Sequence, residues 1–274
     1  MDDTGRTPVV DLRLDRAHSA RIYDYLLGGR THFAADREAA GRILAAFPAA
    51  GAAARINRDF MARATRRLAH DGMVQFLDIG TGIPTSPNLH EVAQRIRPGA
   101  RVVYTDNDPI VLTHAAALLR GRPEGRTAYV EADVTRPESV LGAPRLLATL
   151  DLTRPVALSL NALLHFIGDD GADRGHAVVE HLKGALAPGS TLTITHATAD
   201  FTPAAMAEVG AVYARAGTPF RLRTEAEFRR LFDGWEFIGP GVTLSHRWCP
   251  DRPGDALRAT SAEAACYAAV ARKP

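Results

Sequence analysis

The chain has 274 residues, of which 46% are hydrophobic and 23% are charged, an ordinary composition for one large globular core. Its 33 basic and 31 acidic side chains nearly cancel, which argues against a dedicated nucleic-acid binder. The two cysteines, Cys249 and Cys266, form no CxxC pair for a zinc site and favour a reducing cytoplasm. No apolar run approaches the roughly 20 residues of a membrane span, so we expect no membrane partner.

Only helices are predicted in the first 72 residues, after a flexible lead-in of sixteen. The first begins near Ser19 and stops at the Gly28-Gly29 pair, and the second covers residues 34–47. The third carries Ile56, Phe60, Ala64 and Leu68 at a spacing of four residues and ends near Gly72. We therefore expect residues 1–72 to form a helical cap on a second domain, residues 73–274.

Strands and helices alternate from residue 74 onward. The expected strands are 74–79, 101–105, 127–131, 155–160 and 191–195, and the helices between them are 86–96, 109–120, 137–150 and 174–186. This alternation predicts an α/β fold with a doubly wound parallel sheet, and the nearly continuous apolar strands indicate helices on both faces. Helices over 202–216 and 224–232 and two closing strands, 235–238 and 266–271, complete a mostly parallel sheet of seven strands.

Ligands of such sheets bind beyond the carboxyl ends of the strands. The first strand is followed by Asp78, Gly80, Thr81 and Gly82, and the glycines allow a sharp turn and close approach of the backbone to a ligand. We expect the N–H groups that open the next helix to face that ligand. The alternative is a tight turn without a ligand.

The next three strand ends also carry polar groups. Asp106 and Asn107 follow the second strand, and a carboxylate here can accept both hydroxyls of a ribose, while Asp108 is the better helix cap and leaves Asp106 free. After the third strand, Asp133 can accept the amine of adenine and the Val134 N–H can reach a ring nitrogen. Asn161 follows the fourth strand, which faces the reactive part of the ligand.

Two adenosine cofactors compete for this arrangement. A dinucleotide site has the pattern GxGxxG. In this chain Thr85, preceded by Pro84, occupies the position of the third glycine, which disfavours a dinucleotide. Acids at three strand ends instead favour an adenosine that carries an amino acid, S-adenosylmethionine.

Three segments resemble the cofactor motifs of class I methyltransferases, namely residues 76–94, 102–112 and 128–134. With residues 20–40, LLHFI at His165 and PGVTLSHRWCPD at Trp248, the chain more narrowly resembles an actinobacterial methyltransferase family of unknown substrate. The resemblance implies a Rossmann-like fold and S-adenosylmethionine as cofactor. It places Gly80 and Gly82 at the methionine part, Asp106 at the ribose and Asp133 at the adenine. Pro84 departs from the third glycine of many such enzymes.

Methyl transfer needs alignment and desolvation, and it needs a base only if the nucleophile must lose a proton. His165, beyond the fourth strand, is the candidate catalytic residue, and the alternative is a histidine packed between Leu164 and Phe166. Tyr23 or Arg21 could reach the cofactor carboxylate from the cap, or the helix could simply pack there.

The function expected is methyl transfer from S-adenosylmethionine to a small-molecule acceptor. The alternatives are a non-catalytic regulatory protein that binds S-adenosylmethionine, and an NAD-dependent oxidoreductase, which Pro84 and Thr85 disfavour.

Overall fold

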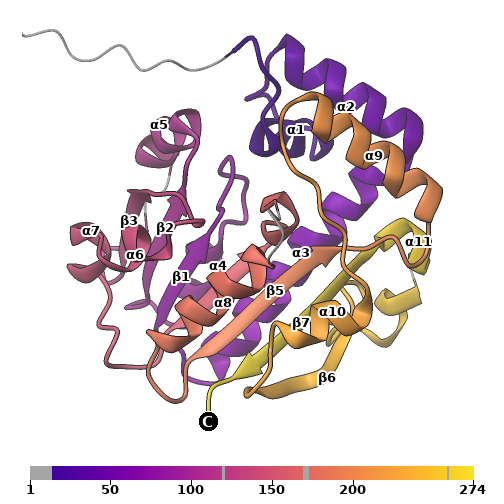
Figure 1. Cartoon of the computed structure of the whole chain (residues 1–274). Coiled ribbons are helices and arrows are strands. Elements are labelled where there is room, and N and C mark those ends of the chain that lie inside the picture. Colours follow the sequence, from indigo (N-terminus) through magenta and orange to yellow (C-terminus); the bar gives the residue numbers. More distant parts are fainter. Residues whose placement is uncertain (1–13, 119–120, 169–172, 258) are drawn as a thin grey trace, which may run out of the picture.

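The structure is a computed structural model that describes residues 14–118, 121–168, 173–257 and 259–274. Within these ranges seven strands form one sheet in the order β3-β2-β1-β4-β5-β7-β6 (Figure 1). The strands are β1 (Gln75–Ile79), β2 (Arg101–Asp106), β3 (Arg126–Glu131), β4 (Ala157–Asn161), β5 (Thr191–Ala197), β6 (Glu236–Leu244) and β7 (Cys266–Arg272).

Helices connect and cover these strands. They are α1 (Ser19–Leu26), α2 (Ala34–Ala46), α3 (Ala50–His70), α4 (Leu89–Ile96), α5 (Pro109–Leu118), α6 (Pro137–Leu141), α7 (Pro144–Leu147), α8 (Arg174–Gly184), α9 (Pro203–Arg215), α10 (Glu225–Arg230) and α11 (Ser261–Ala264), with short 3-10 helices η1 (Leu164–Phe166) and η2 (Pro253–Leu257).

The strand order places the ligand-binding end of the sheet. Strands β1 to β5 pair in parallel, whereas β7 runs antiparallel between β5 and β6. From β1 the chain builds outward to β2 and β3, and then returns to β4 on the other side of β1. This reversal is the topological switch point, where the loops after neighbouring strands diverge and leave room for a ligand.

The predicted alternation of strands and helices is confirmed, with local differences. The helix expected over 137–150 is two short helices, α6 and α7. The strand expected over 235–238 continues to Leu244 through Gly239 and Gly241, which both have φ of 77°. Residues 1–13 of the expected lead-in and residues 119–120 of the expected helix 109–120 lie outside the described ranges.

Side chains of each central strand point alternately to two apolar cores. Leu77 and Ile79 lie in the core that α6, α7 and α8 cover, whereas Phe76 lies in the core on the other face. That second core includes Phe60 and Leu68 of α3. The strands are therefore buried on both sides, as the sequence predicts.

A third apolar cluster joins the two halves of the chain. It contains Ile22 of α1 and Ile43 of α2 together with Val209 and Tyr213 of α9, and Figure 1 shows α2 and α9 side by side. Helix α3 packs on the sheet, so the cap proper is α1 and α2. A domain boundary between residues 72 and 73 stays a prediction.

Candidate functional site

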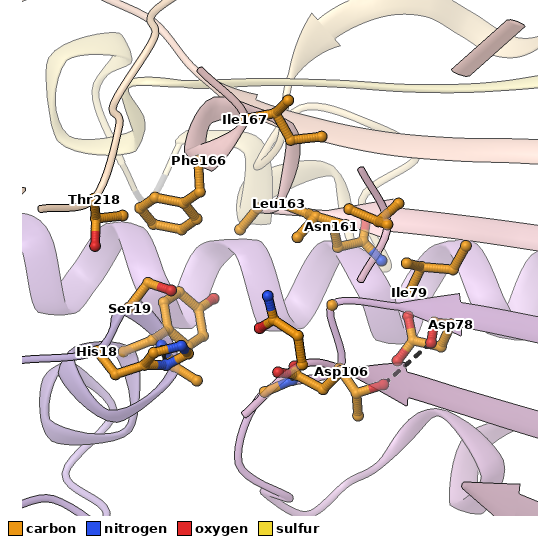
Figure 2. Close-up of a pocket in the computed structure, with 18 of the residues that line it drawn as sticks. His18, Ser19, Asp78, Ile79, Asp106, Asn161, Leu163, Phe166, Ile167 and Thr218 are labelled. Carbon is orange, nitrogen blue, oxygen red and sulfur yellow. Dashed lines mark hydrogen bonds between the residues drawn. The ribbon is translucent and has the colours of Figure 1, made fainter. Parts of the chain in front are cut away.

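The carboxyl ends of the strands and the cap enclose a pocket of about 290 Å³ (Figure 2). The pocket brings together every residue predicted to bind the cofactor, from four strand ends and from α1. These residues are Asp78, Gly80, Thr81, Gly82, Asp106, Asn107, Asp133, Val134, Asn161 and Tyr23.

Two glycines in left-handed conformations build the turn after β1. Gly80 and Gly82 have φ of 72° and 66°, and the Gly80 N–H donates to the Thr105 carbonyl at 2.8 Å. A Cβ at Gly80 would lie 2.6 Å from a methyl carbon of Leu163, whereas a Cβ at Gly82 would meet only Ala20, at 4.0 Å. Glycine is therefore favoured at position 80 by the backbone conformation and by the space left beside Leu163, and at position 82 by the backbone conformation alone.

The helix that follows this turn begins at Leu89, three residues later than predicted. Asn88 Oδ1 accepts a hydrogen bond from the Thr85 N–H at 3.1 Å, which holds the preceding residues as a loop. Of the described residues, none from α4 lines the pocket. The expectation that the opening N–H groups of this helix face the ligand is wrong.

The Asp106 carboxylate is held from two sides. Its Oδ2 accepts from the Gly82 N–H at 2.8 Å and its Oδ1 from the Asp108 N–H at 3.0 Å. Asp108 caps α5 as predicted, since its Oδ1 accepts from the Ile110 N–H at 2.9 Å. Burial raises the pKa of Asp106, against the two N–H donors that lower it. Asp106 is thus not free, but each of its oxygens keeps a lone pair for a hydroxyl group.

The third and fourth strand ends differ in how far their polar groups are paired. Asp133 Oδ1 accepts from the N–H and the hydroxyl of Thr135, at 2.9 and 2.8 Å. The side-chain amide of Asn161 is buried, and neither its nitrogen nor its oxygen has a hydrogen-bond partner in the described structure. An unpaired buried amide in a pocket wall is a candidate to pair with a bound ligand or an ordered water.

The Asp78 carboxyl is buried in the pocket, where its ionised form is energetically unfavourable. It is 9% exposed, and burial raises its pKa to about 7, a rise that Arg58 opposes and the nearby Asp106 carboxylate adds to. Arg58 lies on α3, lines the same pocket and donates to the Pro87 carbonyl at 2.7 Å. A cationic ligand group beside Asp78 would favour its ionised form.

Tyr23 lines the pocket, but its hydroxyl proton is already used. The hydroxyl donates to the Ala54 carbonyl at 3.0 Å and accepts from Asn57 Nδ2 at 2.9 Å. Burial raises the pKa of Tyr23 to about 12, so the phenol stays protonated at neutral pH. Donation from this hydroxyl to a cofactor carboxylate is thus disfavoured. Arg21 does not line the pocket, being 2% exposed and paired with Asp36 of the cap and Asp108 of the loop after β2.

His165 lies behind the pocket wall, which its neighbour Phe166 forms. Its ring packs edge-on against Phe166, His196 and Phe220, and its Nδ1 accepts from the Ala197 N–H at 3.4 Å. Burial, followed by the charges of His196 and Arg223, lowers the pKa of His165 well below its usual value. A catalytic role for His165 stays a prediction, and in this conformation its ring does not reach the pocket.

Several pocket residues were not predicted from the sequence. They come from the cap, from α3 and from loops beyond β4 and α9, and they are His18, Ser19, Asn57, Arg58, Met61, Phe166 and Thr218. Figure 2 shows Phe166 and Thr218 on the same side as His18 and Ser19, away from Asp78 and Ile79. The pocket therefore has a polar end at β1 and a second end between the cap and the loop at Thr218.

Two other kinds of site were sought in the described residues. No group of three or more histidine, cysteine or acidic side chains there is arranged to hold a metal ion. No helix in these ranges is both long and apolar enough to cross a membrane.

A sheet with this order, with a glycine turn after β1 and acids after β2 and β3 around one pocket, defines a Rossmann-like protein whose ligand pocket lies at the carboxyl ends of the strands. The chain belongs to the S-adenosyl methyltransferase family, whose sequence profile matches residues 6–274. It is therefore a methyltransferase that depends on S-adenosylmethionine. This assignment favours an enzyme over a non-catalytic regulatory protein. It gives no support to the alternative of an NAD-dependent oxidoreductase.

Solved structures agree with this assignment. The chain is 50% identical to a DUF574 family protein from Streptomyces avermitilis, with a TM-score of 0.92 over 96% of this chain and 100% of that one. It is 39% identical to a candidate methyltransferase from Thermobifida fusca, with a TM-score of 0.87 over 97% and 98% of the two chains. The N-methyltransferase NodS from Bradyrhizobium japonicum, solved with S-adenosylhomocysteine, shares the fold at 14% identity, with a TM-score of 0.50 over 93% and 99%. No curated protein matches the chain.

Proposed function

We propose that this enzyme methylates a small-molecule acceptor, bound between the cap and the loop at Thr218. The observation that carries this proposal is that the cofactor residues and an apolar wall share one pocket. Leu163, Phe166 and Ile167 form that wall on one side, and Tyr23 and Met61 belong to the cap and α3 on the other. A concave pocket with an apolar wall and a few polar groups is typical of small-ligand sites.

The residues present fit the cofactor. Asp106 would accept hydrogen bonds from the ribose hydroxyls, and Asp133 and Val134 would hold the adenine. Asp78 would face the amino group of the methionine part, which would add to the effect of Arg58 in favouring the ionised form of this buried carboxyl. Gly82 leaves the backbone open on the pocket side, where a Cβ would meet only Ala20. When bound, S-adenosylmethionine supplies a methyl group on a sulfonium, a leaving group that is already activated.

The protein's own task is then to align the acceptor and to exclude water. Asn161 has an unpaired donor and an unpaired acceptor at the end of β4, so it can orient a polar group of either ligand. Phe166 closes the same side of the pocket with an apolar ring.

The two free cysteines, Cys249 and Cys266, further support a cytoplasmic enzyme.

The test is calorimetric titration with S-adenosylhomocysteine, followed by a search for the acceptor. We expect Asp106→Asn to weaken binding by at least about tenfold, because the replacement can no longer accept with both oxygens. Asp233→Asn, on the exposed surface away from the pocket, is the matched control and should bind like the wild type. Folded wild-type protein that binds no S-adenosylhomocysteine would refute the cofactor site.

The acceptor search uses labelled S-adenosylmethionine with fractionated small-molecule and macromolecular extracts. Transfer of the label into the small-molecule fraction is the expected result. Label found only in protein or nucleic acid would overturn the small-molecule part of the proposal while leaving the cofactor site intact.

A further inference from the structure

A cluster of four ionisable side chains, three of them buried, connects the cap to the loop after β2. We call His18, Arg21, Asp36 and Asp108 the cap cluster. Asp36 of α2 is fully buried, and its two oxygens accept from the His18 and Phe33 N–H groups at 2.9 and 2.8 Å. The Arg21 Nε lies 3.5 Å from Asp36 Oδ1 and 3.8 Å from Asp108 Oδ2. One guanidinium thus stands between two buried carboxylates from distant parts of the chain.

Asp108 links this cluster to the residue that would hold the ribose. Its Oδ2 lies 3.1 Å from His18 Nδ1, and its N–H donates to Asp106 Oδ1 at 3.0 Å. The other oxygen of Asp106 is fixed by the Gly82 N–H. A continuous path of ion pairs and hydrogen bonds therefore runs from Asp36 through Arg21 and Asp108 to the ribose acceptor.

The burial of these groups makes the path sensitive to each member. Arg21 and Asp108 are 2% and 4% exposed, so solvent cannot replace a missing partner. Without the guanidinium, Asp36 and Asp108 would face each other as like charges in a medium of low dielectric. The cap would then separate from the β2–α5 loop, or that loop would shift with it.

From this geometry we infer that the cap and the cofactor's ribose are energetically coupled, with Arg21 and Asp36 as positioning residues. The inference rests on the proposed cofactor site. Neither residue lines the pocket, so any effect of theirs on binding must pass through Asp108 or through the placement of the cap. Coupling between two sites is reciprocal, so the cofactor must stabilise the docked cap as much as the docked cap favours the cofactor. Because Ser19 and Tyr23 also line the pocket, the cofactor would order the walls against which the acceptor binds.

The first test compares Asp36→Asn with Glu38→Gln. Glu38 lies on the same helix in an exposed pair with Arg42 at 2.6 Å, so its replacement is a matched control. Titration with S-adenosylhomocysteine, and separately with adenosine, should show at least about tenfold weaker binding for Asp36→Asn and no change for Glu38→Gln. Adenosine should lose the same factor, because the coupling acts at the ribose. Unchanged affinity in folded Asp36→Asn would overturn the inference.

The second test needs no variant and so does not depend on whether Asp36→Asn folds. Amide hydrogen exchange of the wild type is measured with and without S-adenosylhomocysteine. No residue of α2, a helix described in full, lines the pocket, so slower exchange in α2 on binding supports the coupling, and a merely structural role for the cluster would leave the α2 rates unchanged. Binding that protects the β1 and β2 loops and α1 but not α2 would overturn the inference, whereas the absence of any binding would instead refute the proposed function.

Discussion

Replacing Asp78 by asparagine should stabilise the ligand-free protein and weaken its hold on the cofactor. The carboxyl is 9% exposed, and burial raises its pKa from 3.8 to about 7. Asparagine has nearly the same shape and carries no charge. It therefore removes the cost of ionising a buried acid, together with the charge that would face the amino group of the cofactor.

The sign and size of the effect follow from the two pKa values. Because the pKa is higher in the folded than in the unfolded protein, the folded state binds more protons between the two values, and stability is lost as the pH rises through that window. The full difference corresponds to about 4 kcal/mol above pH 7, and to about 2 kcal/mol at pH 5. The free energy of unfolding should thus rise in Asp78→Asn by up to about 4 kcal/mol at pH 8, and by less at pH 5.

The assay is urea unfolding of both proteins at pH 5 and pH 8 without ligand, with Asp233→Asn as a surface control. Titration with S-adenosylhomocysteine over the same range completes it. Wild-type affinity should rise with pH up to about 7 as Asp78 ionises, and Asp78→Asn should lose this dependence. If Asp78→Asn is less stable than the wild type at pH 8, the carboxylate is stabilised by its surroundings and the reasoning is refuted.

Three further substitutions test separate parts of the pocket. Asn161→Ala should lower the affinity for S-adenosylhomocysteine about tenfold in calorimetry. The thermal stability of the ligand-free protein should stay unchanged or rise, because the substitution removes an unpaired buried amide. Equal affinity would show that the amide faces no ligand. Gly80→Ala combines a positive φ with a clash against Leu163 and should cost about 2–4 kcal/mol in urea unfolding, more than Gly72→Ala, which has a positive φ and no clash. His165→Gln should change kcat by the same factor from pH 7 to 9, because burial lowers the pKa of this histidine and keeps it neutral there. Loss of a limb of the pH profile would instead indicate a proton-transfer role.

The strand ends could be predicted from the sequence because their positions follow from the fold. Parallel strands end at one edge of the sheet, so Asp78, Asp106, Asp133 and Asn161 had to meet once the strands were placed. Even the capping role of Asp108 followed from its place before Pro109.

The cap side of the pocket could not be predicted in the same way. His18 precedes α1 as its N-cap and Asn57 and Arg58 belong to α3, and nothing in their spacing says which turn lies over the sheet. His165 shows a finer limit. In a 3-10 helix, successive side chains point about 120° apart, so Phe166 faces the pocket while the residue before it faces the interior.

The packing of α2 against α9 also sets the order in which the enzyme can become functional on the ribosome. The cap helices leave the ribosome before the strands and α9, yet the apolar face of α2 is covered by Val209 and Tyr213, which are made after five of the strands. The strand-end half of the pocket can therefore form before α9 is available for the cap helices to pack against. An incomplete chain would display an open nucleoside-binding face and a loose pair of apolar helices, a state that chaperones would be expected to recognise until α9 is released.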